Sequence, residues 1–479
     1  MTSRIPLVAL LVAPVCAFHG GCATEAGQRT APKAPASAAP EGAPPSEPPP
    51  SLALFEARLK ERTARRAARA WRCWSGERCE AVIDDDGPAA RDREAAEEVL
   101  RAGWRHDPRA DALLRAAARV ALEEAVSVAQ VDEGRAWADA VLWDHEAPFS
   151  LVDLPALLVE APRDRRAALL AKTTSLLEDR AARAASSEQA REEAAARAGL
   201  SEEALLSLRA GLEPGELLRL ARRVLDETDA QAAELPGGPG DVPALGHAVV
   251  SDVDPESAWR GAIVDGIRAG RAAGRGAPLL ACFLIEAPND VRLEGDERAS
   301  ALIARYAKGC AAAGRWHAAG EPVDPLWVHA VATLFRDSAW PVERAARDPD
   351  GLRRLRQLRL LDLRRAAVEV TALLEGAAGD RARLDALATR WAAPGAAVVS
   401  GASALLAPRA DGASVDALVA SLVARELERS LTSQLGEGWA RGEGEPVARI
   451  LVELGAKWRR EGPRAFLALD DATLSKASK

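Results

Sequence analysis

After residue 53 the chain consists mainly of helix-forming residues: Ala, Leu, Arg and Glu predominate, with few aromatic side chains and few β-branched runs. Asp107–Val126 illustrates the pattern. It opens with Asp-Pro, which is typical of a helix start, and continues through Leu113, Leu114 and Val120. This composition and spacing predict helices that pack through one apolar face. We therefore expect a predominantly all-α fold.

Further helices are predicted wherever the same periodicity recurs between Pro and Gly residues, at 53–72, 163–183, 187–199, 216–234 and 348–375. Residues 148–155 (PFSLVDLP) read as a loop, and the Pro/Gly cluster at 236–240 is the best internal boundary. The segment at 279–293 breaks the helical pattern, because two apolar runs flank Pro288-Asn289-Asp290. That arrangement predicts a small β-hairpin.

The N-terminal residues predict export and a lipid anchor. A basic start is followed by 14 apolar residues, Ile5–Phe18, a run too short to span a bilayer and typical of a signal-peptide core. The next residues, His19-Gly20-Gly21-Cys22, resemble a bacterial lipoprotein signal in which the cysteine is acylated. We expect residues 1–21 to be the signal peptide; an ordinary cleaved signal peptide without lipidation is the alternative.

Residues 22–52 hold the lipidated Cys22 and a stretch rich in Pro and Ala, which cannot bury a core. It reads as an extended tether at most about 85 Å long, at about 3.1 Å per residue. The predicted partner of this end of the chain is thus a membrane, reached through the lipid. The expected location is the cell envelope, on the outer membrane facing the periplasm in a Gram-negative cell.

Charge and cysteine content narrow the remaining possibilities. The net charge of −8 argues against a nucleic-acid partner, because binding phosphates needs a positive field. In an oxidising compartment Cys73 and Cys79, six residues apart, are the expected disulfide pair, with two free thiols as the alternative. The pairing of Cys282 and Cys310 stays open.

Five segments, in order, resemble zinc oligopeptidases of the thimet oligopeptidase/oligoendopeptidase type, over roughly residues 120–467. They include LVDLPALLVEAPRDRRAAL (151–169), ACFLIEAPNDVRLEGDERASALI (281–303) and the arginine-rich 348–375; the other two are 192–228 and 427–458. The resemblance implies two helical lobes, 53–240 and 241–475, that close around a channel admitting peptides. It also implies a hairpin leading into the metal-site helix.

The residues that carry zinc chemistry in that family are missing here. His-Glu-x-x-His, which supplies two zinc ligands and the general base, occurs nowhere in the chain. Aligning the apolar residues before the motif puts Ala304, Arg305 and Lys308 in place of His, Glu and His. A shift of two residues offers Tyr306, Ala307 and Cys310 instead, which is no better.

The downstream positions differ as well. His329 stands where the family has its third ligand, a glutamate, and the oxyanion-stabilising tyrosine falls near Ala413 or Ala417. Tyr306 is the only tyrosine of the chain. Zinc ligands, base and oxyanion donor are thus absent together, so the resemblance implies a lipid-anchored pseudo-peptidase that binds a peptide or protein without cutting it, and needs no cofactor.

Two other functions stay open. A rebuilt metal site could use His317, Glu321 and His329, although Gly320 and Pro322 argue against a continuous helix there. A purely structural helical lipoprotein is the other.

In residues 348–375 leucines fall on one stripe, and most arginines are expected in solvent, with an anion-binding surface as the alternative.

Overall fold

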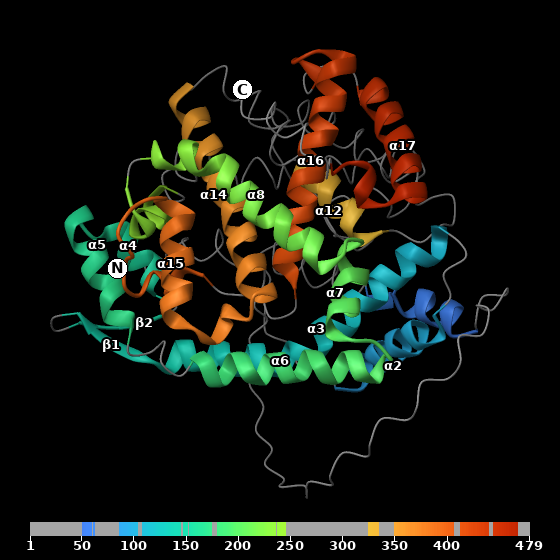
Figure 1. The fold of residues 1–479 in the computed structure, drawn as a ribbon, viewed down its shortest axis with the longest axis horizontal. Coiled ribbons are helices and arrows are strands. Elements are labelled where there is room, and N and C mark those ends of the chain that lie inside the picture. The colour runs from blue at the N-terminus through green and yellow to red at the C-terminus, as the bar shows by residue number, and fades with distance from the viewer. Residues whose placement is uncertain are drawn as a thin grey trace, which may run out of the picture.

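The structure is a computed structural model, drawn in Figure 1. The residues that it describes are 50–59, 61–62, 86–103, 108–144, 147–151, 153–174, 180–235, 237–245, 324–334, 349–406, 412–439 and 444–467. Within them the fold is predominantly α-helical, with a single two-stranded sheet, and the predicted all-α class is confirmed. The two-lobed oligopeptidase arrangement stays a prediction, and the hairpin expected at 279–293 lies outside the described residues.

A lower layer of helices is formed by α2 (Asp86–Ala102), α3 (Pro108–Asp139), α6 (Arg180–Arg197) and α7 (Glu202–Ala210). Helices α3 and α6 lie side by side along the base of the view in Figure 1. Their small and leucine side chains form one core cluster that includes Phe55 of the N-terminal helical residues. Helix α7 begins where the Ser201 hydroxyl accepts a bond from the Ala204 N–H at 3.1 Å.

The upper helices share one larger core. They are α8 (Pro214–Ala233), α12 (Pro325–Leu334), α14 (Pro349–Leu374), α15 (Arg381–Ala392), α16 (Ala413–Leu435) and α17 (Gly444–Glu461). Leucines of α8, which precedes the predicted boundary at 236–240, pack in the same apolar cluster as α14 and α16, which follow it. This cluster supports the site described below.

A small flank completes the fold beside α15. Strands β1 (Val141–Asp144) and β2 (Ala147–Ser150) pair antiparallel, with Leu142 opposite Phe149. They lead into α4 (Leu154–Glu160) and α5 (Arg163–Lys172), whose leucines bury the inner face of the hairpin. Short 3-10 turns link the elements: η3 (Pro239–Asp241), η6 (Ala377–Gly379), η7 (Ala402–Leu405) and η9 (Pro463–Ala465).

Two local predictions were wrong. The loop expected over 148–155 contains the end of β2 and the start of α4, because Phe149 and Leu154 enter a core that the local sequence does not show. The single helix expected over 163–183 ends at Lys172 instead. There the Thr173 hydroxyl donates to the Leu170 carbonyl at 2.7 Å, and α6 begins at Arg180.

Some arginines are buried, including one in the run over 348–375, where most arginines were expected in solvent. Arg62, in the segment expected at 53–72, is buried and pairs with Asp92, Glu123 and Glu124. Arg364 of α14 is wholly buried, and its three nitrogens donate to acceptors on α8 and α15. These buried pairs join helices that are far apart in sequence. In the described part of the chain, no helix is long and apolar enough to cross a membrane.

Candidate functional site

Most residues singled out from the sequence lie outside the described part of the chain. These are Ala304, Arg305, Lys308, His317, Glu321, Cys22, Cys73 and Cys79, together with Tyr306, Cys282 and Cys310. His329 is described and is half-buried on α12, and Ala413 and Ala417 are described on α16. The alternative metal site of His317, Glu321 and His329 is therefore a prediction of which the structure describes one residue.

Helix α12 packs along α16, so His329 is on a neighbour of the helix where the oxyanion tyrosine was expected. The N-terminal end of α16 contains Ala417 and, directly before it, the buried Asp416. Arg209 binds Asp416 in two-pronged fashion, with Nε–Oδ1 at 3.2 Å and Nη2–Oδ2 at 2.6 Å. Arg119 reaches the same carboxylate at 2.8 Å.

The charges around Asp416 decide its protonation state. Burial by itself would raise the pKa of the carboxyl, but Arg119 and Arg209, followed by His329, hold that pKa below its usual value. The carboxylate is thus ionised and committed to two guanidinium groups. It does not fit a zinc ligand, because zinc would have to displace two arginines that already satisfy its oxygens. Among the residues that the structure describes, no group of three or more His, Cys, Asp and Glu could hold a metal ion.

Helix α12 is fixed at its start by a second buried carboxylate. Asp324 accepts hydrogen bonds from Arg115 Nε and from the Trp458 indole, each at 2.7 Å. The Trp458 ring packs on Trp327 with centroids 5.4 Å apart. Polar and aromatic contacts together connect the start of α12 to α3 and α17.

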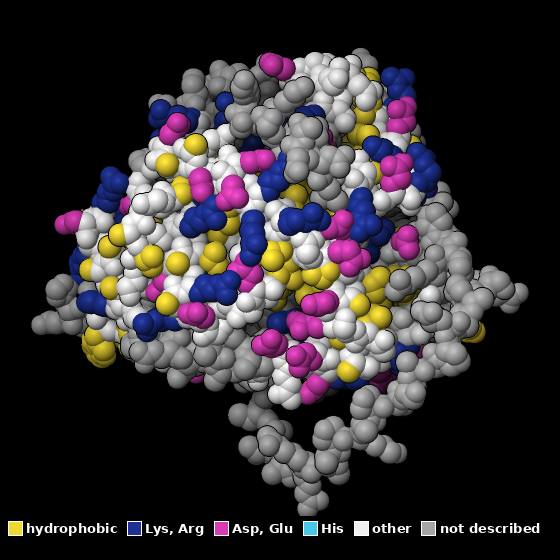
Figure 2. Space-filling view, viewed as in Figure 1, with side chains coloured by type: hydrophobic (Ala, Val, Ile, Leu, Met, Phe, Trp, Pro, Cys, Tyr) yellow, Lys and Arg dark blue, Asp and Glu magenta, His cyan; other side chains and the backbone are white. Residues whose placement is uncertain are grey.

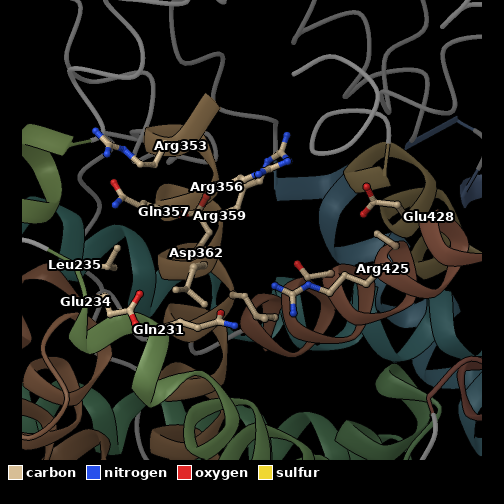
Figure 3. A pocket seen from close by; sticks show the side chains of 14 residues that line it. Gln231, Glu234, Leu235, Arg353, Arg356, Gln357, Arg359, Asp362, Arg425 and Glu428 are labelled. Carbon is tan, nitrogen blue, oxygen red and sulfur yellow. The ribbon is translucent and has the colours of Figure 1, made fainter. Parts of the chain in front are cut away.

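The described part of the chain has a cavity of about 660 Å³ between α8, α14 and α16. We call it the groove, and Figure 3 shows it from close by. The end of α8 supplies Gln231, Glu234 and Leu235. Helix α14 supplies Arg353, Arg356, Gln357, Arg359, Leu360, Asp362 and Leu363, and α16 supplies Ser421, Ala424, Arg425 and Glu428.

The groove combines an apolar base with a polar rim. Leu363 and Ala424 are buried members of the large core cluster, and Leu235 packs against that cluster. In Figure 3 Arg356 and Arg359 extend from α14 toward α16, while Arg425 extends from α16 toward α14. Gln231 and Glu234 lie on the α8 side. Basic side chains therefore enter the groove from two opposed helices.

The face of the molecule drawn in Figure 2 mixes basic and acidic side chains over α8 and α14. Two ion pairs connect these elements: Arg390 of α15 reaches Asp229 of α8 at 2.8 Å, and Arg222 of α8 reaches Glu375, directly after α14, at 2.6 Å. These pairs join the helices that lie beside the groove.

Sequence reasoning missed the groove as a site. For the arginines of 353–359 the sequence predicts a mainly solvated face, with an anion-binding surface as the alternative. Nothing local indicated that α8 and α16 would flank them, because Gln231 and Arg425 are more than sixty residues away on either side. A single run of arginines and leucines predicts only the side chains of its own helix, which forms one wall of the groove.

Comparison with known proteins adds no relative: no protein-family model, no curated protein and no solved structure matches this chain. The resemblance to zinc oligopeptidases accordingly stays a prediction that rests on the sequence segments alone.

Proposed function

We propose that this chain is a non-catalytic binding protein of the cell envelope, which holds a peptide segment of a partner in the groove between α8, α14 and α16. The observation that carries the proposal is the groove itself, with its buried apolar base and its polar rim contributed by three helices. Its volume of about 660 Å³ falls within the roughly 300–1,000 Å³ typical of ligand sites.

The groove chemistry suits a peptide. The side-chain amides of Gln231 and Gln357 can each donate to and accept from a peptide backbone, and Leu235 and Leu360 offer apolar contacts. Arginine adds planar, multiply donating groups on both walls. A ligand with alternating polar and apolar groups can satisfy all three kinds of side chain at once.

The non-catalytic part of the proposal rests on the sequence. A zinc peptidase needs two imidazoles, a carboxylate base and an oxyanion donor, and the aligned positions hold Ala304, Arg305 and Lys308. Arg305 and Lys308 would put positive charge where that family puts a cation. These substitutions favour binding without hydrolysis, in the manner of a pseudo-peptidase.

The anchor belongs to the same proposal. Lipidation at Cys22 and the tether over 22–52 would hold the helical body near a membrane while leaving the groove free to meet a partner. Mass spectrometry of the mature protein should find an acylated N-terminal cysteine at position 22. A free N-terminus at another residue would refute the anchor, and it would leave the groove proposal standing.

The binding test uses the full mature chain and a pool of fluorescein-labelled random hexapeptides. Fluorescence anisotropy should show saturable binding, and mass spectrometry of the pool after incubation should find it intact. Ser421→Trp puts an indole into the groove from α16 and should weaken binding about tenfold or more. Ser433→Trp, on an exposed position of the same helix outside the groove, is the matched control.

Two results would overturn the proposal. One is absence of binding, or binding that Ser421→Trp leaves unchanged. The other is chelator-sensitive cleavage of the pool that His329→Ala abolishes, since this would establish the rebuilt metal site in place of a binding protein.

A further inference from the structure

One stretch of α14 carries charge of one sign. From 353 to 360 the sequence is RRLRQLRL, with four arginines and no acidic residue. Three of the four, Arg353, Arg356 and Arg359, line the groove at a spacing of three residues, which sets them along one side of the helix. The nearest acidic residue of α14 in the groove is Asp362, at the lower end of this row.

The opposite wall adds a fourth guanidinium group. Arg425 of α16 is exposed, lines the groove and extends toward α14, opposite Arg356 and Arg359 in Figure 3. Three acidic residues line the groove as well: Glu234 is on the α8 side, Asp362 is three residues after Arg359 on α14, and Glu428 is three residues after Arg425 on α16. The groove lining thus holds four arginines and three acidic residues, in a protein whose net charge is −8.

We propose that the groove selects peptide segments that carry carboxylates, and that Arg356 and Arg425 are the two residues that bind them. This inference rests on the proposed function and names the class of its ligand. A guanidinium group binds a carboxylate through two parallel hydrogen bonds, and it keeps its charge at any physiological pH. Two such groups on facing helices can hold an acidic side chain or a C-terminal carboxylate from both sides.

The walls of the groove strengthen this selection. Leu360, Leu363 and Ala424 make the floor apolar, so an ion bound above them is less screened than one on an open surface. Glu234, Asp362 and Glu428 act in the opposite direction and disfavour acidic ligands near their own positions in the groove. Removing an arginine and removing a glutamate should consequently change affinity in opposite senses.

The test compares three fluorescein-labelled hexapeptides of equal length on the full mature chain: one rich in Asp and Glu, one with Asn and Gln in their place, and one rich in Lys. The acidic peptide should bind most tightly, and its affinity should fall as salt is raised from about 0.05 to 0.5 M. Arg356→Gln and Arg425→Gln should each weaken it about three- to tenfold, with little effect on the neutral peptide. Glu428→Gln should tighten it about twofold.

Arg429→Gln is the matched control. Arg429 is exposed on the same helix as Arg425, pairs with Glu426 and does not line the groove, so its removal changes net charge equally without touching the site. It should leave the affinity for the acidic peptide within about twofold of the wild-type value. Far-UV circular dichroism of each variant checks that the helices are intact.

The outcomes separate the inference from the function beneath it. Suppose that acidic and neutral peptides bind equally, that Ser421→Trp blocks both, and that Arg356→Gln and Arg425→Gln change the affinity of neither. This result would overturn the acidic selectivity and leave the peptide groove in place. Failure of all three peptides to bind would overturn both. Inorganic phosphate that displaces the acidic peptide at equal carboxylate-equivalent concentration would assign the arginines to small anions, and this too would overturn the inference.

Discussion

The buried pair Arg209–Asp416 allows a quantitative test of how the helices are held together. The side chains are 1% and 6% exposed, and Arg119, at 16%, shares the carboxylate. At about 4 Å and an effective dielectric constant near 20, one such charge pair is worth about 4 kcal/mol before desolvation is subtracted. Asp416→Asn keeps the shape and removes the charge, so the two guanidinium groups lose this carboxylate as a counter-ion.

We expect Asp416→Asn to lower the free energy of unfolding by about 3–5 kcal/mol, the range for breaking a buried ion pair from one side. Arg209→Met should cost less, about 2 kcal/mol, because Arg119 still neutralises Asp416. The variant that carries both Asp416→Asn and Arg209→Met should lose less free energy of unfolding than the sum of the two single losses, by about 1 kcal/mol or more. It leaves only the partly exposed Arg119, which can reach water.

Urea unfolding followed by circular dichroism and by tryptophan fluorescence measures all four proteins. The control is Arg429→Met on α16, whose pair with Glu426 is 45% and 30% exposed and should contribute less than about 0.5 kcal/mol. The reasoning fails if Asp416→Asn costs no more than this control. It fails equally if the losses of the two single variants add within about 0.5 kcal/mol.

Two further predictions concern stability. Gly401→Ala should cost about 3 kcal/mol or more in urea unfolding, because Gly401 has φ +79° and an added Cβ would lie 1.9 Å from the Leu170 carbonyl oxygen. Gly395→Ala, at φ +80° in open space, should cost only about 1 kcal/mol, and equal costs would refute the packing argument. The second prediction concerns acid: since the pKa of Asp416 is lowered in the folded state, its contribution is present above the ordinary value of 3.8 and is lost as pH falls through the folded value. The stability difference between wild type and Asp416→Asn should thus be constant from pH 7 to 5 and shrink toward pH 2.5, whereas a constant or growing difference would contradict the assignment.

The segments that repeat a helical period within a few turns could be predicted from the sequence. The helix expected at 216–234 is α8 at Pro214–Ala233, and the one expected at 348–375 is α14 at Pro349–Leu374. Their starts follow from Pro at the first helical turn and from Glu216, which accepts a bond from the Glu213 N–H at 2.9 Å. These signals lie within four residues of one another, so the chain itself contains them.

Where a helix stops in mid-pattern, local sequence is not enough. The residues after Lys172 continue the helical composition, yet α5 ends there and Thr173 packs against the loop at Gly401, more than two hundred residues downstream. In the same way Arg364 looks like its neighbours in a run of arginines. Only the arrival of Thr228, Asp229 and the Trp391 carbonyl from other helices makes it a buried residue.

For the candidate site, the sequence determined which side chains α14 carries. The tertiary structure determined that these side chains line a groove. Arg353, Arg356 and Arg359 lie in consecutive turns of one helix. Their spacing would be unchanged if this side of the helix faced solvent. The meaning of this spacing changes because α16 brings Arg425 opposite these arginines and α8 closes the other side with Gln231. Periodicity fixes which side of a helix a residue occupies, whereas only the packing of distant helices decides what that side meets.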